Sequence, residues 1–142
     1  MRNVFRFALA LIVGIVIGGG VNMALIVLGP TLVPPPPGVD MTTAEGISAA
    51  LQLLEPRHFL VPFLAHALGT FAGALAGALI AASGRSIVAY AIGIVFLCGG
   101  IAASFMIPAP TWFIVLDLVV AYIPMAWLGL FIAKRMKPGT AA

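Results

Sequence analysis

Residues 59–82 read FLVPFLAHALGTFAGALAGALIAA, and this stretch decides the class of fold. At 1.5 Å rise per residue, about 20 apolar residues match the roughly 30 Å hydrocarbon core of a bilayer. Three further stretches have the same character, at residues 7–28, 87–107 and 112–133. Across all four stretches, only two side chains can ionise near neutrality. The sequence therefore predicts four transmembrane helices.

The composition of the 142-residue chain leads to the same fold class. It is 63% hydrophobic and 8% charged, whereas about a quarter of the residues of a soluble domain are charged. The longest segment outside the four stretches, residues 29–58, is too short for an independent core. We therefore expect an all-α fold in which residues 1–142 form a single membrane domain, a four-helix bundle with the lipid bilayer as its partner. No Lys/Arg run is interleaved with aromatic residues, so nucleic acid is not an expected partner.

The distribution of positive charge predicts the orientation of the chain. With four spans, a single basic residue, Arg57, falls on one side of the membrane. Six fall on the other side: Arg2, Arg6, Arg85, Lys134, Arg135 and Lys137. Because positive loops stay in the cytoplasm, we expect a multi-pass protein of the cell (inner) membrane with both termini cytoplasmic. The first apolar run reaches Leu28 without a break, so we expect it to be retained as a span rather than cleaved as a signal peptide.

The segment 29–58 should hold a short helix outside the cytoplasm. We expect the first span to end at Pro30. Thr42 and Glu45 have the spacing of a capping box, and the apolar residues that follow recur with helical spacing. They predict an amphipathic helix over residues 43–54. It would either cover the outer end of the bundle or rest among the lipid headgroups.

Small residues recur at every fourth position in two spans. The second span carries Gly69, Gly73 and Gly77, and the first carries Gly14 and Gly18. In lipid, close backbone contact through such stripes is a main route to helix association. The stripes therefore predict helix packing. Where a stripe is exposed, it favours a homo-oligomer or docking onto a larger membrane complex.

Aromatic residues and a proline add two expectations about the spans. Tyr90, Trp112, Tyr122 and Trp127 lie within a few turns of span ends, as the residues of an interfacial aromatic belt do. Pro124 removes one backbone hydrogen bond from the fourth span, so we expect a kink just inward of the acid in that span.

Four polar residues lie at a common depth on four different spans. Asn22, His66, Ser104 and Asp117 fall within roughly 6–12 Å of the outer surface at 1.5 Å rise per residue. A carboxylate at this depth needs a partner, and His66 is the best candidate for Asp117. We expect these residues to line a polar cavity open to the outside. The alternative is structural: a His–Asp pair that joins two helices, with Asn22 in a packing hydrogen bond and Ser104 bonded to its own helix.

The sequence leaves the function open between three classes. The leading hypothesis is transport or permeation of a small solute or ion, with the His–Asp pair as a proton-linked site. The second is an accessory subunit that stabilises a larger membrane complex. The third is a small membrane enzyme that acts on a lipid or prenyl substrate, with the pair as acid and base. No catalytic, phosphate-binding or metal-binding motif occurs, so we expect neither a cofactor nor a metal.

Overall fold

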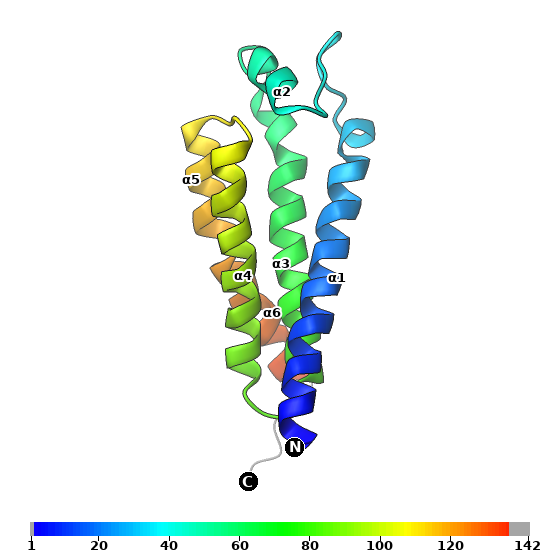
Figure 1. Ribbon diagram of the computed structural model, residues 1–142, viewed down its shortest axis with the longest axis vertical. Coiled ribbons are helices and arrows are strands. Elements are labelled where there is room, and N and C mark those ends of the chain that lie inside the picture. Colours follow the sequence, from blue (N-terminus) through cyan, green and yellow to red (C-terminus); the bar gives the residue numbers. More distant parts are fainter. Residues whose placement is uncertain (1, 137–142) are drawn as a thin grey trace.

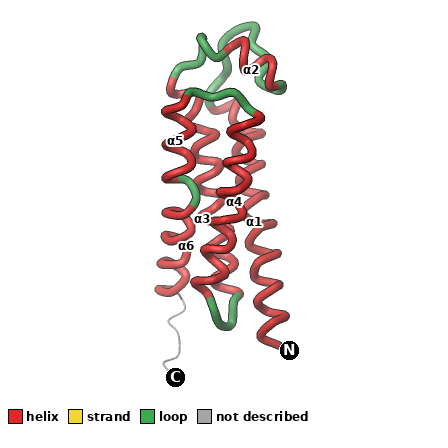
Figure 2. Tube along the Cα trace, turned by 60° about the vertical axis from the view of Figure 1, so that its left-hand side comes forward, coloured by secondary structure: helices red, strands yellow, loops and turns green. Residues whose placement is uncertain are grey.

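The computed structural model describes residues 2–136, and these residues form helices and no strand (Figures 1 and 2). In chain order the elements are α1 (Arg2–Leu32), α2 (Ala44–Ala50), the 3₁₀ helix η1 (Pro56–Phe59), α3 (Leu60–Ile80), α4 (Arg85–Met106), α5 (Thr111–Val120) and α6 (Ile123–Met136). Four helical stretches are long and apolar enough to cross a membrane: Asn3–Leu32, Pro56–Ile80, Arg85–Met106 and Thr111–Met136. The all-helical prediction is therefore confirmed, with four long apolar helices.

The long helices run side by side, and α5 and α6 follow one another along a single column (Figures 1 and 2). We call the end that carries α2 and η1 the loop end. The opposite end, which carries the start of α1 and the close of α6, is the terminal end. Arg6 lies at the terminal end, where its guanidinium donates to the Ile80 carbonyl at the close of α3 (3.2 Å). Arg85, Lys134 and Arg135 also lie at this end, whereas Arg57 lies at the loop end. Lys137 is outside the described residues.

The two glycine stripes face each other along the contact between α1 and α3. A Cβ atom at Gly73 would lie 2.7 Å from the Gly14 carbonyl oxygen, and one at Gly69 would lie 2.8 Å from the Gly18 carbonyl oxygen. A Cβ atom at Gly77 would lie 3.1 Å from the carbonyl oxygen of a third α1 residue. The stripes are therefore used inside the chain, and they give no argument for an oligomer.

Small buried side chains fill the terminal half of the bundle. One cluster joins α3, α4 and α6 through Ala74, Ala78, Ala89, Ala126, Leu130 and Ala133. A second joins α1, α4 and the end of α3 through Ala10, Ala81, Val88 and Ile92. Because alanine and glycine let helix backbones approach closely, the helices converge here. Figure 1 shows α1 and α4 close together at the terminal end and apart at the loop end.

Two expected helix ends are wrong. The first helix passes through Pro30 to Leu32, and the Val33 amide donates to the Gly29 carbonyl (2.8 Å). A proline usually disfavours helix at the preceding residue by a clash with that residue's Cβ, but Gly29 has none. The helix expected over residues 43–54 is shorter, because tight turns to the Ser48 and Ala50 carbonyls replace its last residues.

The start of α2 is also one residue later than the capping box predicts. The Thr43 hydroxyl, rather than that of Thr42, accepts the cap bond, from the Gly46 amide (3.0 Å). Thr42 instead donates its hydroxyl and its amide to the Asp40 carboxylate, at 2.6 and 2.8 Å. These bonds hold the pKa of Asp40 below its ordinary value of 3.8, because they favour the charged carboxylate. Thr42 is therefore bonded to the turn at Asp40, and Thr43 caps α2 in its place.

Candidate functional site

The helix bundle brings His66 and Asp117 together across the boundary between α3 and α5. The His66 Nδ1–H donates to both carboxylate oxygens of Asp117, at 2.9 Å to Oδ1 and 3.0 Å to Oδ2. The Asp117 side chain is 7% exposed, whereas that of His66 is 23% exposed. The Thr70 hydroxyl donates to the His66 backbone carbonyl (2.8 Å), one turn along α3. Because Asp117 occupies Nδ1, the Nε2 atom of His66 is left for a ligand.

A third residue, Tyr122, completes the network, and the sequence analysis missed its role. Its hydroxyl donates to Asp117 Oδ2 (2.8 Å), and its ring stacks on the His66 ring with centroids 5.9 Å apart. At 2% exposure, Tyr122 is buried, so its expected place in an aromatic belt is wrong. Two other residues predicted for the belt are exposed, Trp112 at 48% and Trp127 at 53%.

The break between α5 and α6 makes the contact between Tyr122 and Asp117 possible. In a regular helix, a residue five positions later lies roughly 140° around the axis and cannot return to the same face. Here the helix stops at Val120, a turn spans residues 121–122, and α6 begins at Ile123. Pro124 explains the interruption, because it cannot donate a backbone hydrogen bond. The expected kink is thus a full break, one turn from Asp117.

Gly100 on α4 gives the Tyr122 hydroxyl its room. A Cβ atom at Gly100 would overlap the Tyr122 hydroxyl oxygen and would lie 2.5 Å from the ring carbon that carries it. No side chain larger than hydrogen fits there while the tyrosine reaches Asp117. Gly100 is therefore a second residue of the site that the sequence analysis did not single out, since its requirement comes from another helix.

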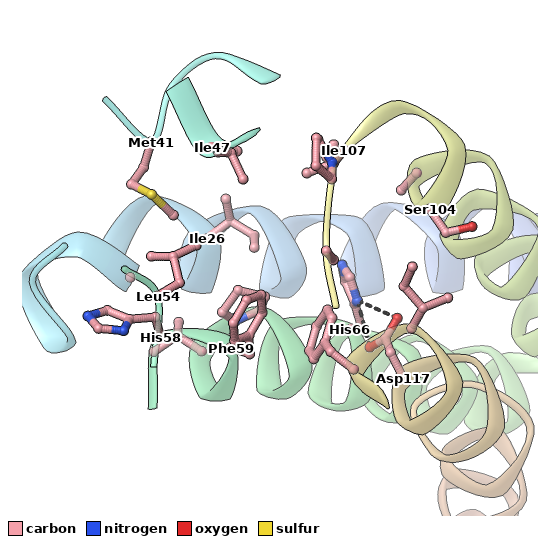
Figure 3. A pocket seen from close by; sticks show the side chains of 18 of the residues that line it. Ile26, Met41, Ile47, Leu54, His58, Phe59, His66, Ser104, Ile107 and Asp117 are labelled. Carbon is pink, nitrogen blue, oxygen red and sulfur yellow. Dashed lines mark hydrogen bonds and ion pairs between the residues drawn. The ribbon is translucent and has the colours of Figure 1, made fainter. Parts of the chain in front are cut away.

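A pocket of about 310 Å³ lies between the loop ends of α1, α3, α4 and α5, beneath α2 (Figure 3). His66 and Asp117 line it together with Ser104. Most of its wall is apolar and comes from residues such as Ile26, Ile47, Leu54, Phe59, Ile107 and Phe113. The volume lies at the lower end of the range for small-molecule sites. The pocket is thus an apolar cavity with a carboxylate–imidazole pair in its wall.

The remaining predicted site residues have different places. Ser104 lines the pocket, and its hydroxyl donates to the Ile101 carbonyl of its own helix (2.7 Å). Asn22 does not line the pocket. Its Cβ packs beside Gly69 at the contact between α1 and α3, and its buried Oδ1 has no hydrogen-bond partner among residues 2–136. The structure therefore brings three of the four predicted polar residues to one cavity and leaves Asn22 outside it.

A second histidine, His58, lines the pocket from η1. The Glu55 amide donates to His58 Nδ1 (2.9 Å), which caps the 3₁₀ helix. The same Nδ1 lies 3.2 Å from the Glu55 carbonyl oxygen, so it accepts from the amide or donates to the carbonyl according to its tautomer. The neighbouring Arg57–Glu55 ion pair (3.1 Å) is exposed on both sides and does not line the pocket.

Two further observations bear on the chemistry of the site. The described residues contain no group of three or more His, Cys, Asp or Glu side chains that could hold a metal ion. The sequence matches no protein-family model, and searches of curated proteins and of solved structures found no match. The function must therefore be argued from the geometry of the chain itself.

Proposed function

We propose that the chain is a multi-pass protein of the cell (inner) membrane, with both termini in the cytoplasm and the loop end outside. Four long apolar helices support the membrane location. Large side chains on their outer faces are highly exposed, among them Phe105 at 87% and Val4 at 73%. Such surfaces are unfavourable in water and suit lipid. The gathering of basic residues at the terminal end supports the orientation.

The function that the site supports best is proton-linked transport of a small solute, loaded from the outside. The observation that carries this proposal is the His66–Asp117 pair in the wall of a pocket at the loop end, above a terminal half that alanine side chains fill. We interpret this arrangement as an outward-open state with its inner half closed. Ionisable groups inside membrane proteins commonly mark substrate or proton pathways.

The helix break offers a route from the pair to the rest of the bundle. The backbone carbonyl of Asp117 accepts the Ala121 amide (2.9 Å), and its carboxylate accepts the Tyr122 hydroxyl (2.8 Å). Both donors belong to the turn that separates α5 from α6. A change in protonation or occupancy at Asp117 therefore acts directly on the junction where α6 can move against α5. Hinges of this kind are a few residues at element ends that absorb backbone change.

Proteoliposomes that contain a pH-sensitive dye test this proposal. A panel of small amines, alcohols and carboxylic acids is added outside, and movement of protons across the membrane is recorded. We expect at least one class to drive proton movement with the wild type, and Asp117→Asn to abolish it while the circular dichroism spectrum is retained. Equal proton movement with Asp117→Asn, or none with any class, would refute the proposal.

A second candidate is a membrane enzyme that acts on a lipid or prenyl substrate. One observation favours it: Asp117 holds Nδ1 of His66, a residue that lines the pocket, which is how a carboxylate orients a histidine base. Product formation from a lipid extract, lost with His66→Gln, would support this candidate. The third hypothesis, an accessory subunit, stays a prediction; recovery of a stoichiometric partner in mild detergent tests it.

A further inference from the structure

The net charge of the His66–Asp117 pair in the pocket wall depends on one proton. The titratable lining residues of the pocket are His58, His66 and Asp117, and no Lys or Arg among the described residues lines it. The Nδ1 atom of His58 is engaged by the backbone of Glu55, at 2.9 Å from its amide and 3.2 Å from its carbonyl oxygen. His66 is the lining histidine that contacts Asp117, so a proton on His66 balances the carboxylate charge. The Tyr122 hydroxyl also faces Asp117, and it donates a hydrogen bond without adding charge.

We propose that the pocket binds a small hydrophobic ammonium ion, which exchanges with a proton on His66. This inference rests on the proposed transport function and names its substrate class. With His66 neutral, the pair carries one negative charge, and the Nε2 lone pair can accept an N–H bond from an ammonium group. With His66 protonated, the pair is neutral and Nε2 has no lone pair to offer.

Charge balance within a low-dielectric site selects the cation. Either a proton on His66 or a bound ammonium ion brings the His66–Asp117 pair to zero net charge. An anion would add a second negative charge beside Asp117, and an unbalanced buried charge is costly. The exchange is also balanced in protons: the ammonium ion enters with its own N–H bonds, and the proton leaves His66 Nε2 for water.

The walls of the pocket fit the apolar part of such an ion. The rings of Phe59 and Phe113 line it with centroids 5.0 Å apart, and aromatic rings attract cations. At about 30 Å³ per non-hydrogen atom, the 310 Å³ cavity has room for about ten atoms. Ile26 and Ile107 line the pocket and are 38% and 48% exposed, so its rim is apolar as well.

Equilibrium dialysis of the full-length protein in lipid nanodiscs, against empty nanodiscs, tests the inference. The probes are phenethylammonium, 2-phenylethanol and phenylacetate, which share a body of this size and differ in charge. At pH 8 we expect phenethylammonium to bind at least about tenfold more tightly than the other two. Its affinity should be lower at pH 5.5 than at pH 8, because a proton on His66 competes with it. Equal or tighter binding of the alcohol or the acid overturns the inference.

Two variants compare how an acid in the pocket and an acid on the outer loop affect binding. Asp117→Asn should weaken phenethylammonium binding at least about tenfold and change 2-phenylethanol binding less than about twofold. Glu45→Gln removes an exposed acid of α2 outside the pocket and should change neither. If Asp117→Asn does not fold, the binding of the three probes to the wild type at the two pH values still tests the inference. An equal loss with Glu45→Gln also overturns the inference.

Failure of this inference can be told apart from failure of the proposed function. If proton movement in proteoliposomes follows the alcohol or the acid and requires Asp117, transport stands and the ammonium ion is the wrong substrate. If phenethylammonium binds as expected but no solute drives proton movement, the ligand class stands and proton-linked transport is wrong.

Discussion

The contact between the glycine stripes of α1 and α3 gives the most quantitative prediction. A Cβ atom at Gly69 would lie 2.8 Å from the Gly18 carbonyl oxygen and 2.9 Å from the Asn22 Cβ. Ordinary contacts of a Cβ atom begin near 3.4 Å, so Gly69→Ala must push the helices apart by about half an ångström. A backbone oxygen cannot rotate away, and overpacking of this kind costs about 1–3 kcal/mol.

Gly20→Ala is the matched control for Gly69→Ala. Gly20 is also helical, but a Cβ atom there meets nothing within 4 Å. Both substitutions gain the same helix propensity, about 1 kcal/mol, so the difference between them isolates the contact. Unfolding of each variant by titration with SDS in mixed micelles, followed by circular dichroism, measures that difference. We expect Gly69→Ala to be less stable than Gly20→Ala by about 1–3 kcal/mol. Equal free energies of unfolding would refute the close contact between α1 and α3.

Three further predictions concern polar side chains. Tyr122→Phe removes the hydroxyl bond to Asp117 and should lower the free energy of unfolding by about 1–3 kcal/mol in the same SDS titration, since a buried acceptor loses a donor; no change would mean that the bond is absent in lipid. Asp40 has a lowered pKa, so its bonds to Thr42 stabilise the turn above pH 3.8 and are lost as pH falls through the lower, folded value; a carboxyl NMR titration with a midpoint at or above 3.8 would contradict this. Ser104→Ala should change phenethylammonium binding less than about twofold, because its hydroxyl donates to its own helix; a tenfold loss in the dialysis assay would place that hydroxyl on the ligand.

The long helices could be predicted from sequence because their signal is local. Length and apolar composition define a span without reference to any partner, and the four described stretches follow from them. The pairing of His66 with Asp117 could be inferred as well, since a carboxylate at that depth requires a partner and depth is read from position along a helix. Their role in transport stays a prediction.

The rest depends on how the helices turn toward one another. Tyr122 looks like a belt residue until the break at residues 121–122 returns its hydroxyl to Asp117. Asn22 shares its depth with the pair, but the rotation of α1 packs it beside Gly69. The need for Gly100 arises only once Tyr122 passes it. None of these three facts is visible in the spacing of residues along one helix.

The central claim is that the imidazole of His66 and the carboxylate of Asp117 meet inside the membrane. Solid-state NMR on the protein in bilayers, with ¹⁵N in histidine and ¹³C in aspartate side chains, measures this contact through their dipolar coupling. We expect strong coupling between His66 Nδ1 and the Asp117 carboxyl carbon, in agreement with a 2.9 Å hydrogen bond. The coupling should be lost with Asp117→Asn, in which residue 117 no longer carries the aspartate label. Absence of coupling in the wild type would separate the two side chains and leave the pocket without its polar pair.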